Sequence, residues 1–274
     1  MAVTNAETHD VDVELPGSAL DAARMPGHWL LARMGKTVLR PGGRELTDKL
    51  LGSLDIGRGD DVLELAPGLG STTRLVLDRR PASYTGVDRD PDAAARVDVL
   101  AHSATARVVN ASAGDTGLAD ASASVAFGEA YLTMQPDRLK SEIFAELHRV
   151  VAPGGRIGLH EIALRPDDID DERAKEVKGA LRSSIMVSVC PTTLSGWRGL
   201  VEDAGFEVED IDTAPLHLLE PRRLVADEGL GGAVRFAGRV LRNPPARRRV
   251  IAMRKAMHAN AASLEAFCMT ARRL

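Results

Sequence analysis

The chain has 274 residues, of which 44% are hydrophobic and 27% are charged, and its formal net charge is −4. This length is enough for a full hydrophobic core and for one or two domains. No apolar run reaches the roughly 18 residues of a membrane span, and the polar, acidic residues 1–14 do not resemble a secretion signal. Cys190 and Cys268 are too few and too far apart for a disulfide framework or a metal site. We therefore expect a cytoplasmic protein with no metal and no membrane span.

Strand and helix patterns alternate along most of the chain, which is typical of a parallel sheet covered by helices on both faces. Two helices are predicted ahead of the first strand, at 18–34 and 42–51. Strands are predicted at 61–66, 83–88, 106–111, 124–130, 156–162, 206–213 and 265–271. Helices are predicted between them at 71–78, 91–101, 138–150, 170–184 and 193–204. Thr192 or Thr193 is expected to cap the last of these helices, and Pro153-Gly154-Gly155 predicts a turn before the strand at 156–162.

The segment 215–262 lies between the last two predicted strands and predicts a helical insertion. It is rich in arginine, with Arg222, Arg223, Arg235, Arg239, Arg242, Arg247, Arg248, Arg249 and Arg254. An arginine-rich helical face suits an anionic ligand, a lipid surface or RNA, although most charged runs are only solvated. The acidic net charge does not favour nucleic acid.

The most informative stretch begins at Val62, where an apolar run ends in Glu64-Leu65 and a loop with Gly68 and Gly70 follows. This pattern indicates a strand, a tight loop and a helix. The loop glycines remove Cβ atoms where a ligand must lie against the backbone. The free N–H groups at the helix start favour an anionic group. The stretch therefore predicts a nucleotide-type pocket.

Polar residues follow the next strands at the same edge of the sheet. Asp88 ends the strand at 83–88, about 20 residues after the loop, where a carboxylate accepts hydrogen bonds from ribose hydroxyls. Asp115 and Thr116 follow the third strand and are candidates for contact with adenine, with a simple turn as the alternative for Asp115. Glu129 and Tyr131 follow the fourth strand, where a second substrate is expected to bind.

These motifs resemble the class I S-adenosylmethionine-dependent methyltransferases, of the small-molecule type that includes the ubiquinone and menaquinone methyltransferases. The resemblance covers 55–213 and 265–273. It rests on Glu64-Leu65-Ala66-Pro67-Gly68-Leu69-Gly70, Gly86-Val87-Asp88, Gly114-Asp115-Thr116 and the run from Leu147 to Gly155. It implies a Rossmann-like α/β fold with a mostly parallel seven-stranded sheet, S-adenosylmethionine as the cofactor and S-adenosylhomocysteine as the product.

Position by position, the resemblance implies roles for the cofactor-binding residues. Glu64 would orient the loop and the methionine amino group, and Gly68 and Gly70 would admit the methionine part. Asp88 would bind the ribose hydroxyls, and Asp115 with Thr116 would bind the adenine. The further cofactor-binding candidates are Ala66, Arg89 and Glu129. Ala66 stands where the family has its first loop glycine, and Pro67 follows it, so the backbone contacts of this loop are expected to differ.

His160, Glu161 and Glu129 are the candidate catalytic residues. His160 and Glu161 end the fifth predicted strand, so either is a candidate base or acceptor contact, and the alternative is a hydrogen-bonded core residue. No second histidine completes a helical zinc motif there. A base is needed only when the acceptor is a hydroxyl or a protonated amine, because the sulfonium is already activated.

The candidate substrate-binding residues are His28, Trp29, Tyr131, Met134, His160 and His217. Packing roles for Trp29, Tyr131 and Met134 remain the alternatives. We expect an N-terminal helical cap at 1–40, a cofactor-binding core at 41–214 and 263–274, and an acceptor-side insertion at 215–262. The expected activity is methyl transfer to O, N, S or C of a small molecule, with a homo-oligomer left open.

Two other functions are weighed against it. The first is methylation of RNA or protein. Enzymes that methylate amide or exocyclic nitrogen commonly carry an Asp/Asn-Pro-Pro-aromatic motif after the fourth strand, and Gly128-Glu129-Ala130-Tyr131 stands there instead. A regulatory module that binds the cofactor without turnover would keep the same pocket residues.

Overall fold

A computed structural model describes residues 15–274, and the polar segment 1–14 lies outside the described residues. Eight strands in this part of the chain form one sheet in the order β3-β2-β1-β4-β5-β8-β7, with the short β6 beside β5. β8 is antiparallel to β5 and β7, and the other pairs are parallel. The strands are β1 (Asp61–Leu65), β2 (Ser83–Asp88), β3 (Ala106–Asn110), β4 (Ala123–Glu129), β5 (Val151–Leu164), β6 (Thr192–Thr193), β7 (Phe206–Pro215) and β8 (Leu264–Arg273).

The α/β prediction is confirmed, and the expected seven strands become eight because Thr192 and Thr193 pair with the end of β5. The α-helices are α1 (Gly27–Arg33), α2 (Gly43–Leu54), α3 (Ser71–Leu77), α4 (Pro91–Leu100), α5 (Asp137–Val150), α6 (Asp171–Ile185), α7 (Leu194–Asp203), α8 (Pro221–Arg242) and α9 (Pro244–Ala259). Short 3₁₀ turns lie at Leu132–Met134 and Ala261–Ser263. None of the helices described is both long and apolar enough to cross a membrane.

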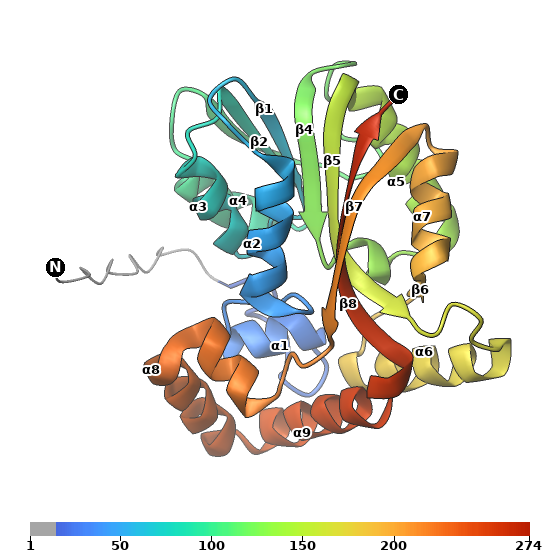
Figure 1. Ribbon diagram of the computed structural model, residues 1–274. Helices are drawn as coiled ribbons and strands as arrows, with labels where there is room; N and C mark the ends of the chain where they lie inside the picture. The colour runs from blue at the N-terminus through green and yellow to red at the C-terminus, as the bar shows by residue number, and fades with distance from the viewer. Residues whose placement is uncertain (1–14) are drawn as a thin grey trace, which may run out of the picture.

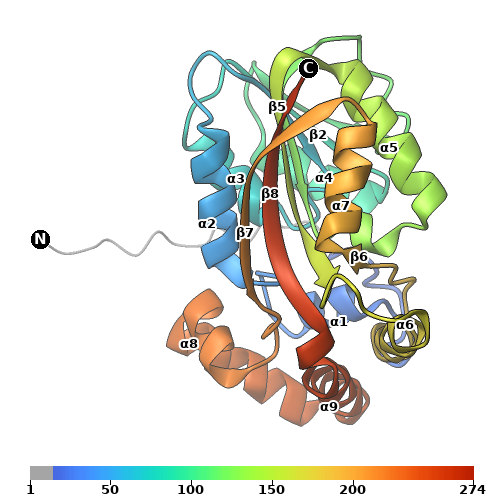
Figure 2. The same ribbon diagram turned by 45° about the vertical axis from the view of Figure 1, so that its right-hand side comes forward.

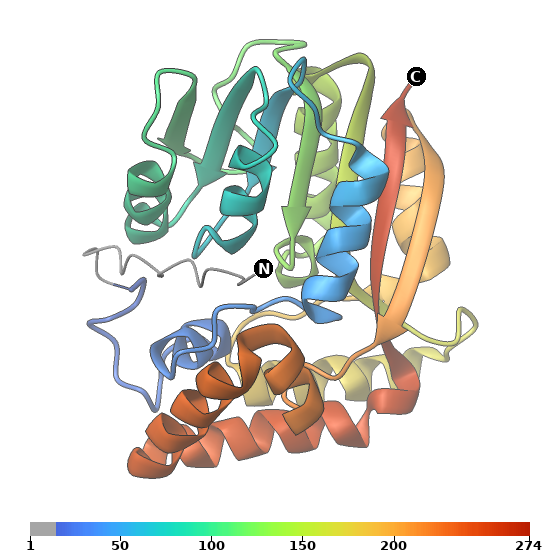
Figure 3. The same ribbon diagram turned by 60° about the vertical axis from the view of Figure 1, so that its left-hand side comes forward.

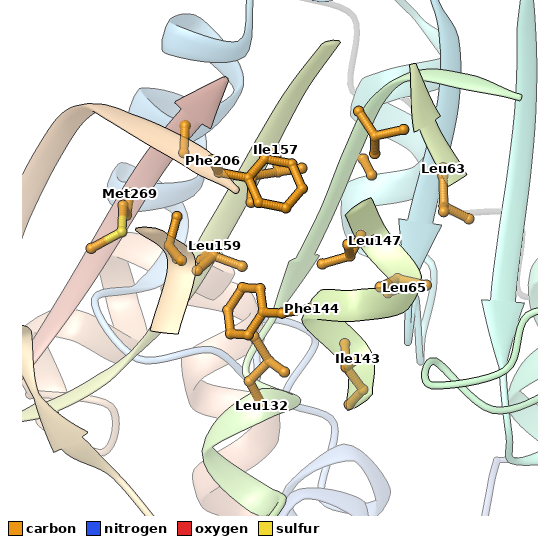
Figure 4. Close-up of a cluster of buried hydrophobic side chains, with 14 of the residues drawn as sticks. Leu63, Leu65, Leu132, Ile143, Phe144, Leu147, Ile157, Leu159, Phe206 and Met269 are labelled. Atoms are coloured by element: carbon orange, nitrogen blue, oxygen red, sulfur yellow. The ribbon is translucent and has the colours of Figure 1, made fainter. Parts of the chain in front are cut away.

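Successive apolar side chains of β1 point to opposite faces of the sheet, so helices must cover both faces. Val62 faces a cluster with Leu50 of α2 and Val76 of α3. Leu63 and Leu65 face the opposite cluster, which contains residues of α5 and α7 (Figure 4). Figure 2 shows α2 on one side of the sheet and α5 and α7 on the other.

A third layer of helices lies beyond the carboxyl ends of the parallel strands. Figures 1 and 3 show α1, α6, α8 and α9 together at this end. Their inward residues share one apolar cluster, including Leu30, Leu181, Phe236 and Met253. The segment before the core and the insertion before β8 therefore pack into a common layer.

Two predicted elements differ from the structure. The helix expected at 18–34 is confined to Gly27–Arg33, and turns precede it, because Pro26 has no N–H for an upstream helix to continue through. β5 begins at Val151, so Pro153-Gly154-Gly155 lies inside the strand. The pairing with β4 shifts register there, and Gly154 has a left-handed φ of 74°, so the segment is an irregularity within β5 and not a turn ahead of it. Thr193 caps α7 as expected, through its hydroxyl and the N–H of Gly196.

Candidate functional site

A cavity of about 650 Å³ lies at the carboxyl ends of β1, β2 and β4. The loops after these strands form one wall, and residues from 26–40 form the facing wall. This is the edge at which open α/β sheets bind ligands. The cavity collects the sequence-predicted Glu64, Ala66, Gly68, Asp88, Arg89, Glu129, His28, Trp29, Tyr131 and Met134.

The loop between β1 and α3 adopts the left-handed backbone that glycine favours. Ala66, Gly68 and Gly70 have φ values of 53°, 56° and 73°. A Cβ on Gly70 would meet the Leu100 side chain of α4, so both this close packing and the left-handed φ favour glycine here. A Cβ on Gly68 would meet nothing closer than 3.9 Å, where it finds Ala66 O and Trp29 Cη2. Gly70 thus serves packing, whereas Gly68 keeps its side of the loop open toward the cavity.

Asp88 fixes this loop from the end of β2. Its Oδ2 accepts a hydrogen bond from the N–H of Gly68 at 3.1 Å, and its Oδ1 accepts one from the N–H of Asp90 at 3.0 Å. Burial raises the pKa of this carboxyl, although the two N–H donors act in the opposite direction. Asp88 is therefore a buried acceptor on the cavity wall, directly beside the left-handed loop.

Glu64 is a buried carboxylate with one oxygen fully engaged. Its Oε2 accepts hydrogen bonds from the hydroxyls of Thr73 at 2.7 Å and Tyr84 at 2.6 Å. No hydrogen bond from residues 15–274 reaches its Oε1. Burial raises the pKa of Glu64 to about 7, against the lowering effect of the two hydroxyls. Glu64 thus brings an unused acceptor oxygen to the cavity.

Glu129, at the end of β4, is surrounded by partners. Its Oε1 accepts a hydrogen bond from the Thr47 hydroxyl at 2.6 Å and lies 3.3 Å from Arg40 Nε, and its Oε2 accepts one from the Thr72 hydroxyl. His160 Nδ1 lies 2.7 Å from Oε1. Burial acts to raise the pKa of Glu129, but the charge of Arg40 and the bond to His160 hold it at about 2. A carboxylate with so low a pKa is a weak base, so the structure does not favour the catalytic role expected for Glu129.

The structure places His160 and Glu161 off the cavity wall, so it gives no support to the expected base and acceptor-contact roles, which stay predictions. Both side chains are fully buried. His160 spans from Glu129 to the carbonyl of Pro41, to which its Nε2 donates. Glu161 accepts hydrogen bonds from the N–H groups of Tyr131, Leu132 and Thr133 and from the Thr133 hydroxyl. Both residues fix neighbouring segments in place, which was the alternative weighed for them.

Asp115, Thr116 and His217 also lie off the cavity wall. Asp115 and His217 are exposed, and Thr116 is buried with its N–H and hydroxyl bonded to Glu146 of α5. Ser112 and Ala113, a few residues earlier in the same loop, line the cavity instead. The turn that follows β3 therefore presents its first residues to the cavity and uses the later ones to hold α5.

Two residues on the expected substrate side carry polar atoms without partners. His28 Nδ1 and the Tyr131 hydroxyl are buried, and neither forms a hydrogen bond with any residue from 15–274. Burial lowers the pKa of His28 to about 4, against the raising effect of Asp90, so its ring is neutral at pH 7. Burial raises the pKa of Tyr131. Buried polar groups without partners are costly, so both are sites where a ligand would gain hydrogen bonds.

Sequence reasoning missed Arg40, Thr47 and Thr72. Thr72 follows the glycine loop directly, and the first turn of such a helix faces the ligand, so its position was a usable signal. Arg40 and Thr47 come from the segment before β1 and reach Glu129 only through the tertiary fold. Among the described residues, no group of three or more His, Cys, Asp or Glu side chains is arranged to hold a metal ion.

Comparison with known proteins agrees with this geometry. The family model described as "Methyltransferase domain" matches residues 62–155. A Haemophilus influenzae protein described as uncharacterized is 32% identical over 214 residues, which are 77% of this chain and 83% of that protein. The 27-O-demethylrifamycin SV methyltransferase of Amycolatopsis mediterranei is 29% identical over 176 residues, 61% of each chain. The crystal structure of MccD protein shares the fold, with a TM-score of 0.68 and 17% identity over 86% of this chain and 99% of that one. The chain belongs to the class I S-adenosylmethionine-dependent methyltransferases.

Proposed function

We propose that this methyltransferase transfers the methyl group of S-adenosylmethionine to a small-molecule acceptor inside the cavity described above. The observation that carries the proposal is the cavity wall itself, where the open Gly68 loop, Asp88 and the free oxygen of Glu64 meet. A volume of about 650 Å³ lies within the usual range of small-molecule sites.

The residues that line the cavity fit the cofactor. Glu64 Oε1 offers a hydrogen bond to the methionine ammonium group, and Asp88 offers acceptors to the ribose hydroxyls. Gly68 leaves room for the methionine part beside Ala66, and Arg89 borders the ribose side. For the adenine we replace the expected Asp115 and Thr116 with Ser112 and Ala113, because only the latter line the cavity.

Bound there, the sulfonium would supply an activated methyl group for direct in-line displacement. The work left to the chain is to align the acceptor and exclude water. Trp29 and Met134 supply apolar surface, and His28 Nδ1 and the Tyr131 hydroxyl offer hydrogen bonds that orient an acceptor. We assign no general base, since His160 and Glu161 are sealed from the cavity.

The helical layer would complete this chamber. Segment 26–40 supplies one cavity wall, and α8 holds that segment through Glu228, which accepts hydrogen bonds from the N–H groups of Thr37 and Val38. We therefore keep 1–40 and 215–262 as proposed capping units around the core at 41–214 and 263–274. The relative whose name specifies a demethylrifamycin also supports an acceptor of small-molecule type.

The first test is calorimetric titration with S-adenosylmethionine. Asp88→Ala is expected to weaken binding by more than about 1 kcal/mol, because charge-assisted hydrogen bonds to the ribose are lost. Asp92→Ala is the matched control, since Asp92 is exposed in the first turn of α4 and does not line the cavity. Equal affinities in both variants would place the ribose elsewhere.

The second test identifies the acceptor. The enzyme is incubated with methyl-labelled cofactor and cell extract, and the label is followed into metabolites, RNA and protein. Label in a metabolite is the expected result. Label confined to RNA or protein would refute the small-molecule proposal, and cofactor binding without any transfer would indicate a regulatory module.

A further inference from the structure

The helices α8 and α9 carry more than half of the large hydrophobic side chains that are exposed in the described chain. Five of the nine large hydrophobic side chains exposed among residues 15–274 belong to these two helices. Leu230, Val234 and Leu241 are 71%, 63% and 64% exposed, and Ile251 is 59% exposed. Contiguous exposed apolar side chains commonly mark a binding surface.

Helical spacing places these residues on the sides that face away from the core. On α8, the buried Phe236 and Val240 point to the core, whereas Leu230, Val234 and Leu241 repeat at four and seven residues on the outer side. On α9, Ile251 is exposed between the buried Val250 and Met253. Figures 1 and 3 show α8 and α9 side by side at the end of the molecule, beyond the sheet.

The same two helices carry positive charge that the described chain does not neutralise. The segment 221–259 has ten arginine and lysine residues and two acidic ones, although the whole chain has a net charge of −4. Seven of these cations are exposed and form no ion pair or side-chain hydrogen bond with residues 15–274: Arg222, Arg235, Arg239, Arg242, Arg247, Arg248 and Lys255. The Arg239 guanidinium lies against Gly35 of the N-terminal segment. We call the other six cations, with Leu230, Val234, Leu241 and Ile251, the basic helical face.

The two acidic residues of the segment are used on the inner side. Asp227 bonds to Arg223 at 2.8 Å and lies 3.4 Å from the buried Lys36 ammonium. Glu228 accepts hydrogen bonds from the N–H groups of Thr37 and Val38. The inner side of α8 is thereby fixed to the core, and the charge of the basic helical face is left for an external anion.

We propose that the basic helical face binds the surface of an anionic lipid membrane. Basic amphipathic helices lie in the membrane interface, where apolar side chains enter the headgroup–acyl boundary and arginines meet the phosphates. The exposed apolar residues are aliphatic, which suits acyl chains, whereas unspecific RNA binding relies on aromatic stacking. A symmetric dimer through this face would bring like charges together. The proposal concerns a surface separate from the cavity, and it stands whether or not the small-molecule acceptor is correct.

Co-sedimentation with vesicles tests the proposal on the full chain. The wild type is mixed with vesicles of phosphatidylcholine containing phosphatidylglycerol, and with vesicles of phosphatidylcholine alone. Two double variants alter the surface: Arg235→Glu with Arg242→Glu, and Leu230→Ser with Leu241→Ser. Exposed residues far from α8 and α9 give matched controls: Arg58→Glu with Arg80→Glu for charge, and Val99→Ser for apolar exposure. Thermal unfolding and cofactor titration verify that each variant is folded.

We expect binding to the anionic vesicles only, with at least about tenfold weaker binding in both surface variants and no change in the controls. Added salt should weaken wild-type binding. Three outcomes overturn the proposal. The first is no binding to anionic vesicles, and the second is equal loss in the control variants. The third is that the protein binds a single-stranded RNA, or dimerises, but does not bind vesicles, and that the surface variants abolish this RNA binding or dimerisation.

Discussion

Glu64 is the residue for which the structure makes the sharpest quantitative prediction. Its pKa of about 7, against 4.5 for an ordinary glutamate, means that burial disfavours its ionised form by roughly 3 kcal/mol in the folded protein. The folded state then binds a proton more tightly than the unfolded state. Wild-type stability should therefore fall as the pH rises from about 4.5 to about 7, and this loss should persist above that range.

The substitution Glu64→Gln removes the charge and keeps the shape and the acceptor oxygen for Thr73 and Tyr84. We expect it to raise the free energy of unfolding by up to about 3 kcal/mol at pH 8, with a much smaller gain near pH 5. The same change should weaken S-adenosylmethionine binding by about 1.5–3 kcal/mol, because a charge-assisted hydrogen bond to the ammonium group is lost. Higher stability with poorer binding is the expected signature.

Urea unfolding at several pH values and calorimetric titration measure these two effects. Below pH 7, wild-type affinity should fall up to about tenfold for each pH unit, since the carboxyl must be deprotonated before it pairs with the ammonium group. Tyr84→Phe provides a graded control, because it removes a hydroxyl that lowers the pKa of Glu64 and should move this fall to higher pH. Unchanged affinity in Glu64→Gln would refute the ammonium contact, and a stability gain independent of pH would refute the raised pKa.

Three further outcomes follow from the site. Glu161→Ala leaves four hydrogen-bond donors of residues 131–133 without their acceptor. Urea unfolding should show a loss of about 3 kcal/mol or more in the free energy of unfolding, while the folded fraction keeps its cofactor affinity. Stability equal to that of the wild type would contradict this. Ala66→Gly should raise the unfolding free energy by about 0.5 kcal/mol, because relief of the left-handed backbone exceeds the added chain entropy; a loss would contradict it. Ala113→Leu should weaken cofactor binding at least about tenfold by filling the adenine side, whereas Asp115→Ala should leave it unchanged; the reverse order would restore Asp115 to the adenine.

The fold was predictable because its signals are local. The apolar run from Val62 to Leu65, the glycine loop and the first turn of α3 are contiguous, so residue pattern alone identified strand, loop and helix. Ala66 illustrates the limit of such reasoning. The sequence marked it as a departure from glycine, but only the structure shows that alanine adopts the left-handed conformation there.

The end of β5 shows a different limit, because the sequence predicted a catalytic role there and the structure buries both side chains. Position along a strand places His160 and Glu161 near the cavity, and successive side chains of a strand point to opposite faces. What occupies each face is set by residues distant in sequence. Glu161 meets the turn after β4, and His160 meets Pro41, which lies 119 positions earlier in the chain. Spacing within the strand carries no information on either partner.

Glu64 and Glu129 show how tertiary contacts decide which carboxylate remains free for a ligand. Glu64 pairs with Phe127 across β1 and β4, and Glu129 lies two residues further on the same face, so sequence position makes the two nearly equivalent. Arg40 and His160 hold the Glu129 carboxylate, and the pKa falls to about 2. Glu64 has only two hydroxyl partners, and both are on one oxygen, so its pKa rises to about 7. Glu64 is therefore the carboxylate without a cationic partner, and we infer that the methionine ammonium group binds there. Glu129 instead fixes the segment around Arg40 to the sheet.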